Sequence, residues 1–150
     1  MSAPELSSEV VATWDEIATF WDDGIGRDGN KYWRRLQEPS LARLVGDKLS
    51  AASVTGTPCR ALDLATGNRL VARWLAAKGA DVLATDGADA MLEIAKGYVK
   101  KAEMEGMKMK MRFRKVDVTS DEDFAKLVED EKKNNAVRYL PILSIPSSRT

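Results

Sequence analysis

Two acidic residues in this chain are placed where they could bind a nucleoside-like ligand. Asp63 lies in the short apolar run 60–64, which leads into a turn of small residues at 65–68, and Asp86 ends the apolar run 81–85. A small-residue turn lets a ligand approach the main chain, and the N–H groups of the helix that follows can bind it. A carboxylate at the end of the next strand can accept hydrogen bonds from both ribose hydroxyls.

The position of Asp63 indicates the charge of that ligand. In a dinucleotide-binding fold the first strand usually runs directly into a glycine-rich turn, whereas here Asp63 stands two residues before the turn. A carboxylate at this place repels a pyrophosphate and attracts an ammonium group. We therefore expect a nucleoside that carries an amino-acid end. A nicotinamide cofactor fits less well, because the turn lacks two of the three glycines that dinucleotide folds use.

The segments around these acids predict a βαβ unit. The runs 60–64 and 81–85 are too short for helices and are bounded by turn residues, which favours strands. Between them, residues 69–78 repeat at helical spacing and Gly79 follows as a helix cap. The apolar stripe of this helix consists of Leu70, Val71, Trp74 and Leu75.

Three motifs in this order resemble those of the class I S-adenosylmethionine-dependent methyltransferases. Residues 62–68 are similar to the first motif, an acid followed by a glycine-rich turn, and residues 85–92 to the second, with a ribose-binding acid and a methionine near the adenine. Residues 115–118 resemble the third motif, whose acid contacts the adenine amino group. The resemblance implies S-adenosylmethionine as cofactor and a small molecule as substrate. It assigns to the cofactor Asp63, Leu64, Ala65, Thr66, Gly67, Asn68, Asp86, Gly87, Met91, Asp117 and Val118.

The chain departs from the family pattern in the turn and in its length. The family usually has glycine where this chain has Ala65 and Arg69. Arg69 falls where the chain passes the methionine part of the ligand, where it could block binding or pair with Asp63. In the family, residues that position the methyl acceptor mostly follow the fourth strand, which we do not find here, so no catalytic residue is assigned.

The expected fold class is α/β, a three-layer Rossmann-like sheet with an N-terminal helical cap and without the C-terminal strands of the methyltransferase fold. The expected units are the cap at 1–56, a cofactor-binding half-domain at 57–128 and a divergent tail at 129–150. Prolines interrupt the tail, which does not match the family's fourth strand. Loss of that strand leaves 60–64 as an open sheet edge. We therefore expect self-association or binding of a partner chain unless 139–145 pairs with 60–64.

The cap is predicted to be helical. A helix starts near Ser7 and Ser8, repeats apolar residues such as Trp14 and Trp21 at helical spacing, and breaks at Gly24. It either simply packs on the domain or forms a lid over the cofactor, as the resemblance of residues 14–18 to such a lid implies. The next helices cover 31–37 and a segment from Pro39 that directs inward Leu41, Leu44, Val45 and Leu49.

The second half of the chain predicts two more helices and an edge strand. A long helix runs from Asp89 to about Gly106, and Thr119 and Ser120 start another. Between them, residues 107–114 alternate strictly between apolar and basic side chains. A period of two indicates a strand with one buried and one wet face, which suits the edge of the sheet.

Composition limits the classes of function. The chain has 23 basic and 23 acidic residues, so no net basic field favours nucleic acid. It has no histidine and one cysteine, which excludes a Ser-His-Asp site and makes a metal centre unexpected. No apolar run spans a membrane and no signal peptide is evident, so we expect a cytoplasmic protein.

Two functions are expected from the sequence as alternatives. The chain is either a methyltransferase or a non-catalytic relative that binds S-adenosylmethionine, S-adenosylhomocysteine or a partner chain.

Overall fold

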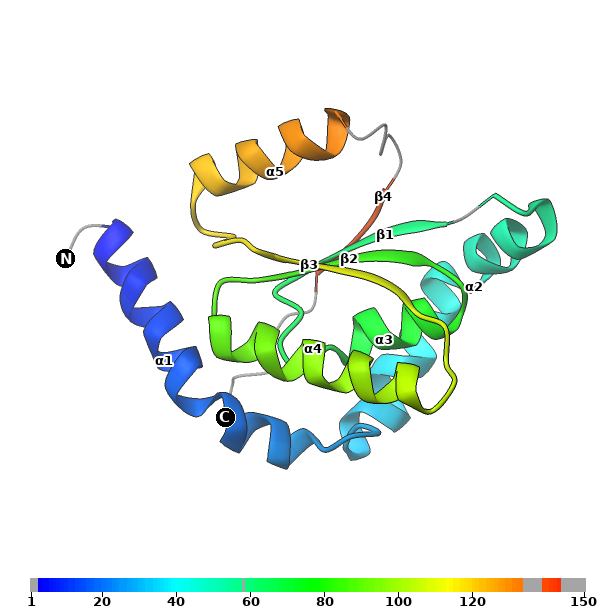
Figure 1. Cartoon of the computed structure of the whole chain (residues 1–150), viewed down its shortest axis with the longest axis horizontal. Coiled ribbons are helices and arrows are strands. Elements are labelled where there is room, and N and C mark those ends of the chain that lie inside the picture. Colours follow the sequence, from blue (N-terminus) through cyan, green and yellow to red (C-terminus); the bar gives the residue numbers. More distant parts are fainter. Residues whose placement is uncertain (1–2, 58, 134–138, 144–150) are drawn as a thin grey trace.

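A computed structural model of the chain describes residues 3–57, 59–133 and 139–143, which form an α/β fold (Figure 1). The N-terminal part is helical, and strands then alternate with helices. The N-terminal elements are α1 (Ala3–Ile25), the π-helical turn η1 (Trp33–Gln37) and α2 (Glu38–Thr55). They are followed by β1 (Arg60–Leu64), α3 (Leu70–Ala77), β2 (Asp81–Asp86), α4 (Asp89–Met104), β3 (Lys110–Lys115), α5 (Asp121–Lys133) and β4 (Tyr139–Leu143).

The four described strands form one parallel sheet in the order β3-β2-β1-β4. The steps from β1 to β2 and from β2 to β3 go in the same direction, so right-handed crossovers place α3 and α4 on the same face. The step from β3 back to β4 reverses this direction and places α5 on the other face (Figure 1). Ligands of such sheets bind outside the carboxyl ends of the strands, near the point of reversal.

The strands bury side chains on both faces of the sheet. Ala61, Val82 and Ala84 face one core, which α3 and α2 complete with Leu75 and Val45. The alternating strand positions Leu62, Leu64 and Leu83 face α5 and form a second core with Val116, which follows β3, and with Leu127 of α5. Because helices cover both faces of the sheet, apolar side chains stand at consecutive positions in the middle of the strands, as at Val82, Leu83 and Ala84 of β2.

The prediction for α2 was wrong at one residue. Val45 and Leu49 are buried and Leu41 packs against the same core, whereas Leu44 is 74% exposed. The buried residues are four apart and therefore share one helix face. Leu44 lies about 100° away from Val45 around the helix axis, which turns it to solvent.

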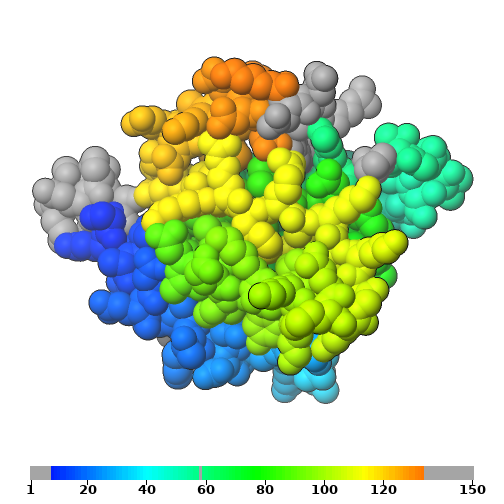
Figure 2. Space-filling view, viewed as in Figure 1, coloured from blue at the N-terminus to red at the C-terminus, as the bar shows by residue number. Residues whose placement is uncertain are grey.

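The prediction of an edge strand is confirmed, although β3 begins at Lys110 rather than at residue 107. Met111 and Phe113 pack against the core beneath α3, while Arg112 and Arg114 point to the other face. There, these arginines pair with Glu131 and Asp130 of α5, at 3.1 and 2.9 Å. Figure 2 shows β3 at the surface between α4 and α5. The face of β3 that we expected to be exposed to solvent therefore forms ion pairs with α5.

The prediction that no fourth strand follows residue 128 was wrong. β4 pairs in parallel with β1, from Arg60 opposite Tyr139 to Leu64 opposite Leu143. Pro141 stands opposite Leu62. A proline is tolerated on an edge strand, where its missing N–H can face away from the neighbour. β1 is therefore paired on both sides. This pairing was the condition under which we did not expect self-association, and residues 144 and 145 of the segment lie outside the described part.

Removal of residues 134–150 is expected to make the chain self-associate. A chain that ends at Lys133 leaves the N–H and C=O groups along one side of β1 unpaired, and such an edge recruits other strands. A chain that ends at Leu143 keeps β4 and serves as the control. Size-exclusion chromatography with light scattering should give a higher mass for the shorter chain only. Equal masses for both truncated chains and the full chain would contradict this role of β4.

The N-terminal helix differs from its prediction in where it begins. Ser7 and Ser8, expected at its start, lie within α1, which begins at Ala3. The helix runs along α4, where Ala18, Trp14 and Trp21 pack near Met91. Among residues 3–57, 59–133 and 139–143, none of the helices has the length and apolar content needed to cross a bilayer.

Candidate functional site

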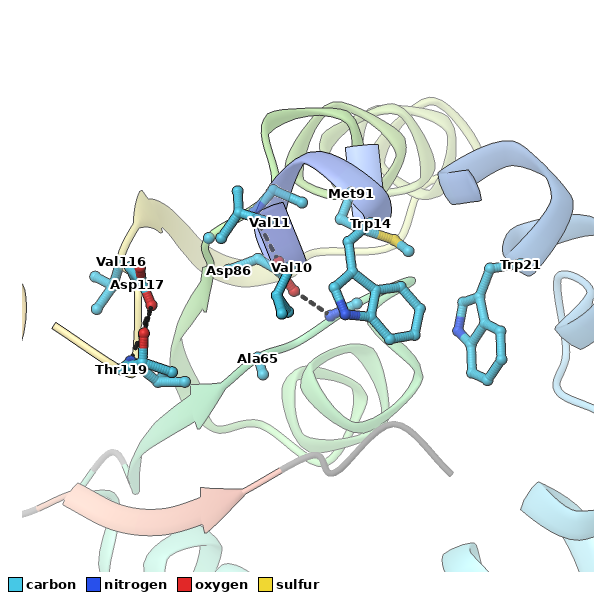
Figure 3. Close-up of a pocket in the computed structure, with 14 residues that line it drawn as sticks. Val10, Val11, Trp14, Trp21, Ala65, Asp86, Met91, Val116, Asp117 and Thr119 are labelled. Carbon is cyan, nitrogen blue, oxygen red and sulfur yellow. Dashed lines mark hydrogen bonds between the residues drawn. The ribbon is translucent and has the colours of Figure 1, made fainter. Parts of the chain in front are cut away.

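A cavity of about 410 Å³ lies where β1, β2 and β3 end, with α1 as one wall (Figure 3). Asp86 is at its centre, Trp14 and Trp21 extend from α1, and Asp117 and Thr119 lie at the opposite side. The walls are mostly apolar. Its volume falls within the usual range of small-molecule sites, which are concave and apolar with a few polar groups.

The carboxylate of Asp86 organises the floor of this cavity. Its Oδ2 accepts a hydrogen bond from the N–H of Gly67 at 2.8 Å, and its Oδ1 accepts one from the N–H of Ala88 at 2.9 Å. Burial raises the pKa of Asp86, although the main-chain hydrogen bonds from Ala88, Gly67 and Gly87 oppose this. Asp86 thus joins the turn after β1 to the start of α4. Each carboxylate oxygen can accept more than one hydrogen bond, so a ligand hydroxyl can still bind.

The structure separates the two acids that we expected to share the ligand. Asp63 is fully buried and does not line the cavity, and its Oδ2 accepts a hydrogen bond from the Thr66 hydroxyl at 2.8 Å. Asp63 lies opposite Ala84 in the sheet, two positions short of Asp86, and belongs to the strand rather than to its tip. Through this hydrogen bond to Thr66, Asp63 stabilises the turn that follows β1.

Seven of the residues assigned to the cofactor line the cavity together: Ala65, Gly67, Asp86, Gly87, Met91, Asp117 and Val118. Leu64 faces α5 instead, and Thr66 and Asn68 line a second, neighbouring cavity. Sequence reasoning missed the contributions of Val10, Val11, Trp21, Ala88, Val116 and Thr119. The α1 residues among these could have been predicted from the helical spacing of the apolar residues, because an apolar stripe on a helix faces the rest of the protein.

The turn has a backbone that favours glycine at both positions where the family resemblance led us to expect one. Ala65 has φ 54° and Arg69 has φ 72°, and these are the non-glycine residues with positive φ in the described chain. Between them, Gly67 has φ 52°. An L-residue in this region is strained by its Cβ atom. The turn therefore has a backbone that favours glycine at two positions that carry other residues.

Ala65→Gly is expected to stabilise the protein by about 0.5–1 kcal/mol. The change relieves the strain at positive φ, and the greater freedom of glycine in the unfolded chain offsets part of the gain. Ala51→Gly, at an exposed position inside α2, is the matched control and should destabilise by about 1 kcal/mol. Urea unfolding measures both. A loss of stability at Ala65 as large as that at Ala51 would contradict the strain.

The sequence suggested that Arg69 could pair with Asp63. In the structure, Arg69 pairs instead with Asp22 near the end of α1, at 2.9 Å. Its guanidinium also lies 3.0 Å from the ring centre of Tyr98, whose hydroxyl donates to Asp22 at 3.0 Å. Arg69 is fully buried, and this burial lowers its pKa while the bond to Asp22 opposes the shift. The residue lines neither cavity. It holds α1, α3 and α4 together instead of closing the ligand site.

The wall formed by α1 is fixed at further points. Asp15 accepts a hydrogen bond from the N–H of Ala90 at 2.8 Å, in the first turn of α4, where a carboxylate also favours the helix dipole. On α1 itself, the rings of Trp14 and Trp21 meet edge to face, with their centres 5.5 Å apart, and both pack against the core that contains Met91 of α4. The helix therefore packs on the domain and lines the cavity at the same time.

Comparison with known proteins assigns no family. A scan of the sequence against protein-family models finds no match, and a comparison with curated proteins finds none. Within the described ranges, no group of three or more acidic, cysteine or histidine side chains could hold a metal ion. What the chain binds must be inferred from the cavity itself.

Proposed function

We propose that this chain binds S-adenosylmethionine in the cavity around Asp86 and is a methyltransferase-like protein that acts on a small molecule. The observation that carries the proposal is the meeting of Asp86, Met91, Asp117 and Val118 in one cavity. These residues come from the second and third motifs, and their spacing along the chain does not require them to share a cavity.

The shape and polarity of the cavity suit the nucleoside part of this ligand. Apolar walls from Met91, Val116 and Val118 suit a flat adenine, and Asp86 suits the ribose hydroxyls. The turn at Gly67 lies next to Asp86, so the amino-acid end of the ligand would meet the turn rather than Asp63. From the sequence we had expected Asp63 to bind the ammonium group of the ligand, and the turn now takes that place in the proposal.

Catalysis would come mainly from positioning the methyl donor against its acceptor. Holding two reactants in line can supply about 7–11 kcal/mol of the barrier without any catalytic base. The chain has no histidine, and Asp86 and Asp117 are the ionisable side chains that line the cavity. An acceptor that needs no strong base is therefore favoured.

A second candidate is a non-catalytic relative that binds S-adenosylmethionine or S-adenosylhomocysteine. This candidate is favoured because both acids already make hydrogen bonds within the protein. Asp86 accepts them from Gly67 and Ala88, and Asp63 accepts one from Thr66, so both acids have a structural role without any reaction. The two candidates share the cavity and differ in turnover. Release of S-adenosylhomocysteine on adding small-molecule acceptors would favour the enzyme.

Isothermal titration of the full chain tests the shared part of the proposal. S-adenosylmethionine should bind at one site, and adenosine, which lacks the amino-acid end, should bind more weakly. S-adenosylmethionine should also bind at least about tenfold more tightly than NAD⁺, because the turn lacks two of the three glycines that dinucleotide folds use to accommodate a pyrophosphate. NAD⁺ binding as tightly as S-adenosylmethionine, or no heat with S-adenosylmethionine, would overturn the proposal.

Binding is also expected to weaken as the pH falls. The ribose hydroxyls donate to the carboxylate form of Asp86, and protonation removes an acceptor. Because burial raises the pKa of Asp86, the loss begins above the ordinary value of 3.8. Titrations at decreasing pH should show falling affinity, and Asp86→Asn should remove this dependence. A constant affinity down to the pH at which the chain unfolds would contradict the role of Asp86.

A further inference from the structure

A second cavity of about 250 Å³ lies next to the first, at the start of α3. Trp21 and Gly67 line both cavities, so the two spaces meet on either side of these residues. Three more aromatic side chains line the second one: Phe20, Tyr32 and Trp33. None of the residues of the first cavity that we assign to the nucleoside, apart from Gly67, contributes to it.

The aromatic residues are arranged from the mouth of this cavity to its interior. Phe20 and Tyr32 are 78% and 71% exposed, whereas Trp33 is 5% exposed. The start of the Trp33 helix is fixed, since Asn30 accepts hydrogen bonds from the main-chain N–H groups of Tyr32 and Trp33 at 3.0 and 3.1 Å. At Gly29, a Cβ atom would come within 2.2 Å of the Trp33 ring. The ring therefore occupies a space that the main chain leaves open for it.

One polar group in this cavity lacks a partner. Asn68 is 5% exposed and lines the cavity, and its Nδ2 has no hydrogen-bond partner among the described residues. Buried amide groups are nearly always hydrogen-bonded, so an unpaired N–H donor points to an acceptor that residues 3–57, 59–133 and 139–143 do not supply.

The charge of the lining limits that acceptor further. Among the lining residues that the structure describes, none has an acidic or basic side chain. The lining combines aromatic side chains with neutral polar ones, among them Asn30, Gln37 and Thr66, and supplies no counter-charge to an ion. Removing an ion from water without a counter-charge is unfavourable. Aromatic walls favour flat rings, which stack face to face or edge to face.

We propose that the second cavity binds an uncharged aromatic molecule whose carbonyl oxygen or ring nitrogen accepts a hydrogen bond from Asn68 Nδ2. A cavity of roughly 150 Å³ holds one benzene ring, so this one accommodates one or two fused rings. Because the cavity adjoins the first at Trp21 and Gly67, such a molecule lies where a methyl acceptor would be needed. The binding itself is independent of the proposed function, and the role as acceptor rests on it.

Titration of the ¹⁵N-labelled full chain with quinolin-2-one, followed by NMR, tests the binding without any cofactor. Quinolin-2-one is neutral and has a carbonyl acceptor, indole has two rings but no acceptor, and quinoline-2-carboxylate has the rings with a charge. The signals of the Asn68 amide and the Trp33 indole should shift. Quinolin-2-one should bind at least about fivefold more tightly than either comparison compound, a ratio that one hydrogen bond supplies.

Variants locate the site and protect the test against misfolding. Phe20→Ala, at the exposed mouth, should weaken binding about threefold or more. Phe124→Ala, a partly exposed aromatic on α5, should leave binding unchanged. Asn68→Asp should remove the preference for quinolin-2-one over indole, and if this variant does not fold, the three compounds and Phe20→Ala still decide. Absent shifts, equal binding of the carboxylate or an unaffected Phe20→Ala would each overturn the site. If quinolin-2-one binds as described and S-adenosylmethionine does not bind, only the proposed function is overturned.

Discussion

Asp86→Ala is expected to weaken S-adenosylmethionine binding by at least about a hundredfold. Hydrogen bonds to a charged group contribute about 1.5–3 kcal/mol each, and the variant loses those of two ribose hydroxyls. It also loses the acceptor that holds Gly67 and Ala88 in place around the cavity. Isothermal titration measures the change.

Two variants serve as controls for this result. Asp86→Asn keeps the shape and one acceptor oxygen, so its affinity should lie between those of the parent and the alanine variant. Asp47→Asn removes an exposed carboxylate on α2 and should bind like the parent. Binding by Asp86→Ala within about threefold of the parent would show that Asp86 does not hold the ligand.

Asp22→Ala is expected to lower the free energy of unfolding by about 3–5 kcal/mol, because it leaves the buried charge of Arg69 without its partner. It also removes the acceptor of the Tyr98 hydroxyl. The matched control is Asp23→Ala, which removes an exposed carboxylate at the next position of α1. Chemical unfolding measures both variants.

A double variant separates the charge from the helix. Asp22→Ala combined with Arg69→Gly removes both members of the pair and supplies a residue that accepts φ 72°. It should be more stable than Asp22→Ala alone. Equal stability of Asp22→Ala and Asp23→Ala would show that the pair contributes nothing.

The sequence predicted those parts of the fold that have local signals. The apolar runs 60–64 and 81–85, bounded by turn residues, correspond to β1 and β2. The alternation around Phe113 marks β3 because a half-buried strand has a period of two. Asp86, directly after an apolar run, lines the cavity.

The parts that could not be predicted depend on contacts between distant segments. β4 contains Pro141, which in isolation argues against a strand, and its pairing with β1 gives no local pattern. Arg69 and Asp22 are 47 positions apart, so no spacing rule connects them. The position of Asp63 could have been predicted. Side chains alternate between the two faces of a strand, so Asp63 faces away from Leu62 and Leu64, toward α3.

The central claim is that Asp86 holds the ribose of an amino-acid-bearing nucleoside. A crystal structure of the chain grown with S-adenosylhomocysteine tests it most directly. The ribose hydroxyls should lie within about 2.5–3.0 Å of the Asp86 carboxylate oxygens, with the adenine between Met91 and Val118. Ligand bound elsewhere, or a ribose turned away from Asp86, would contradict the account.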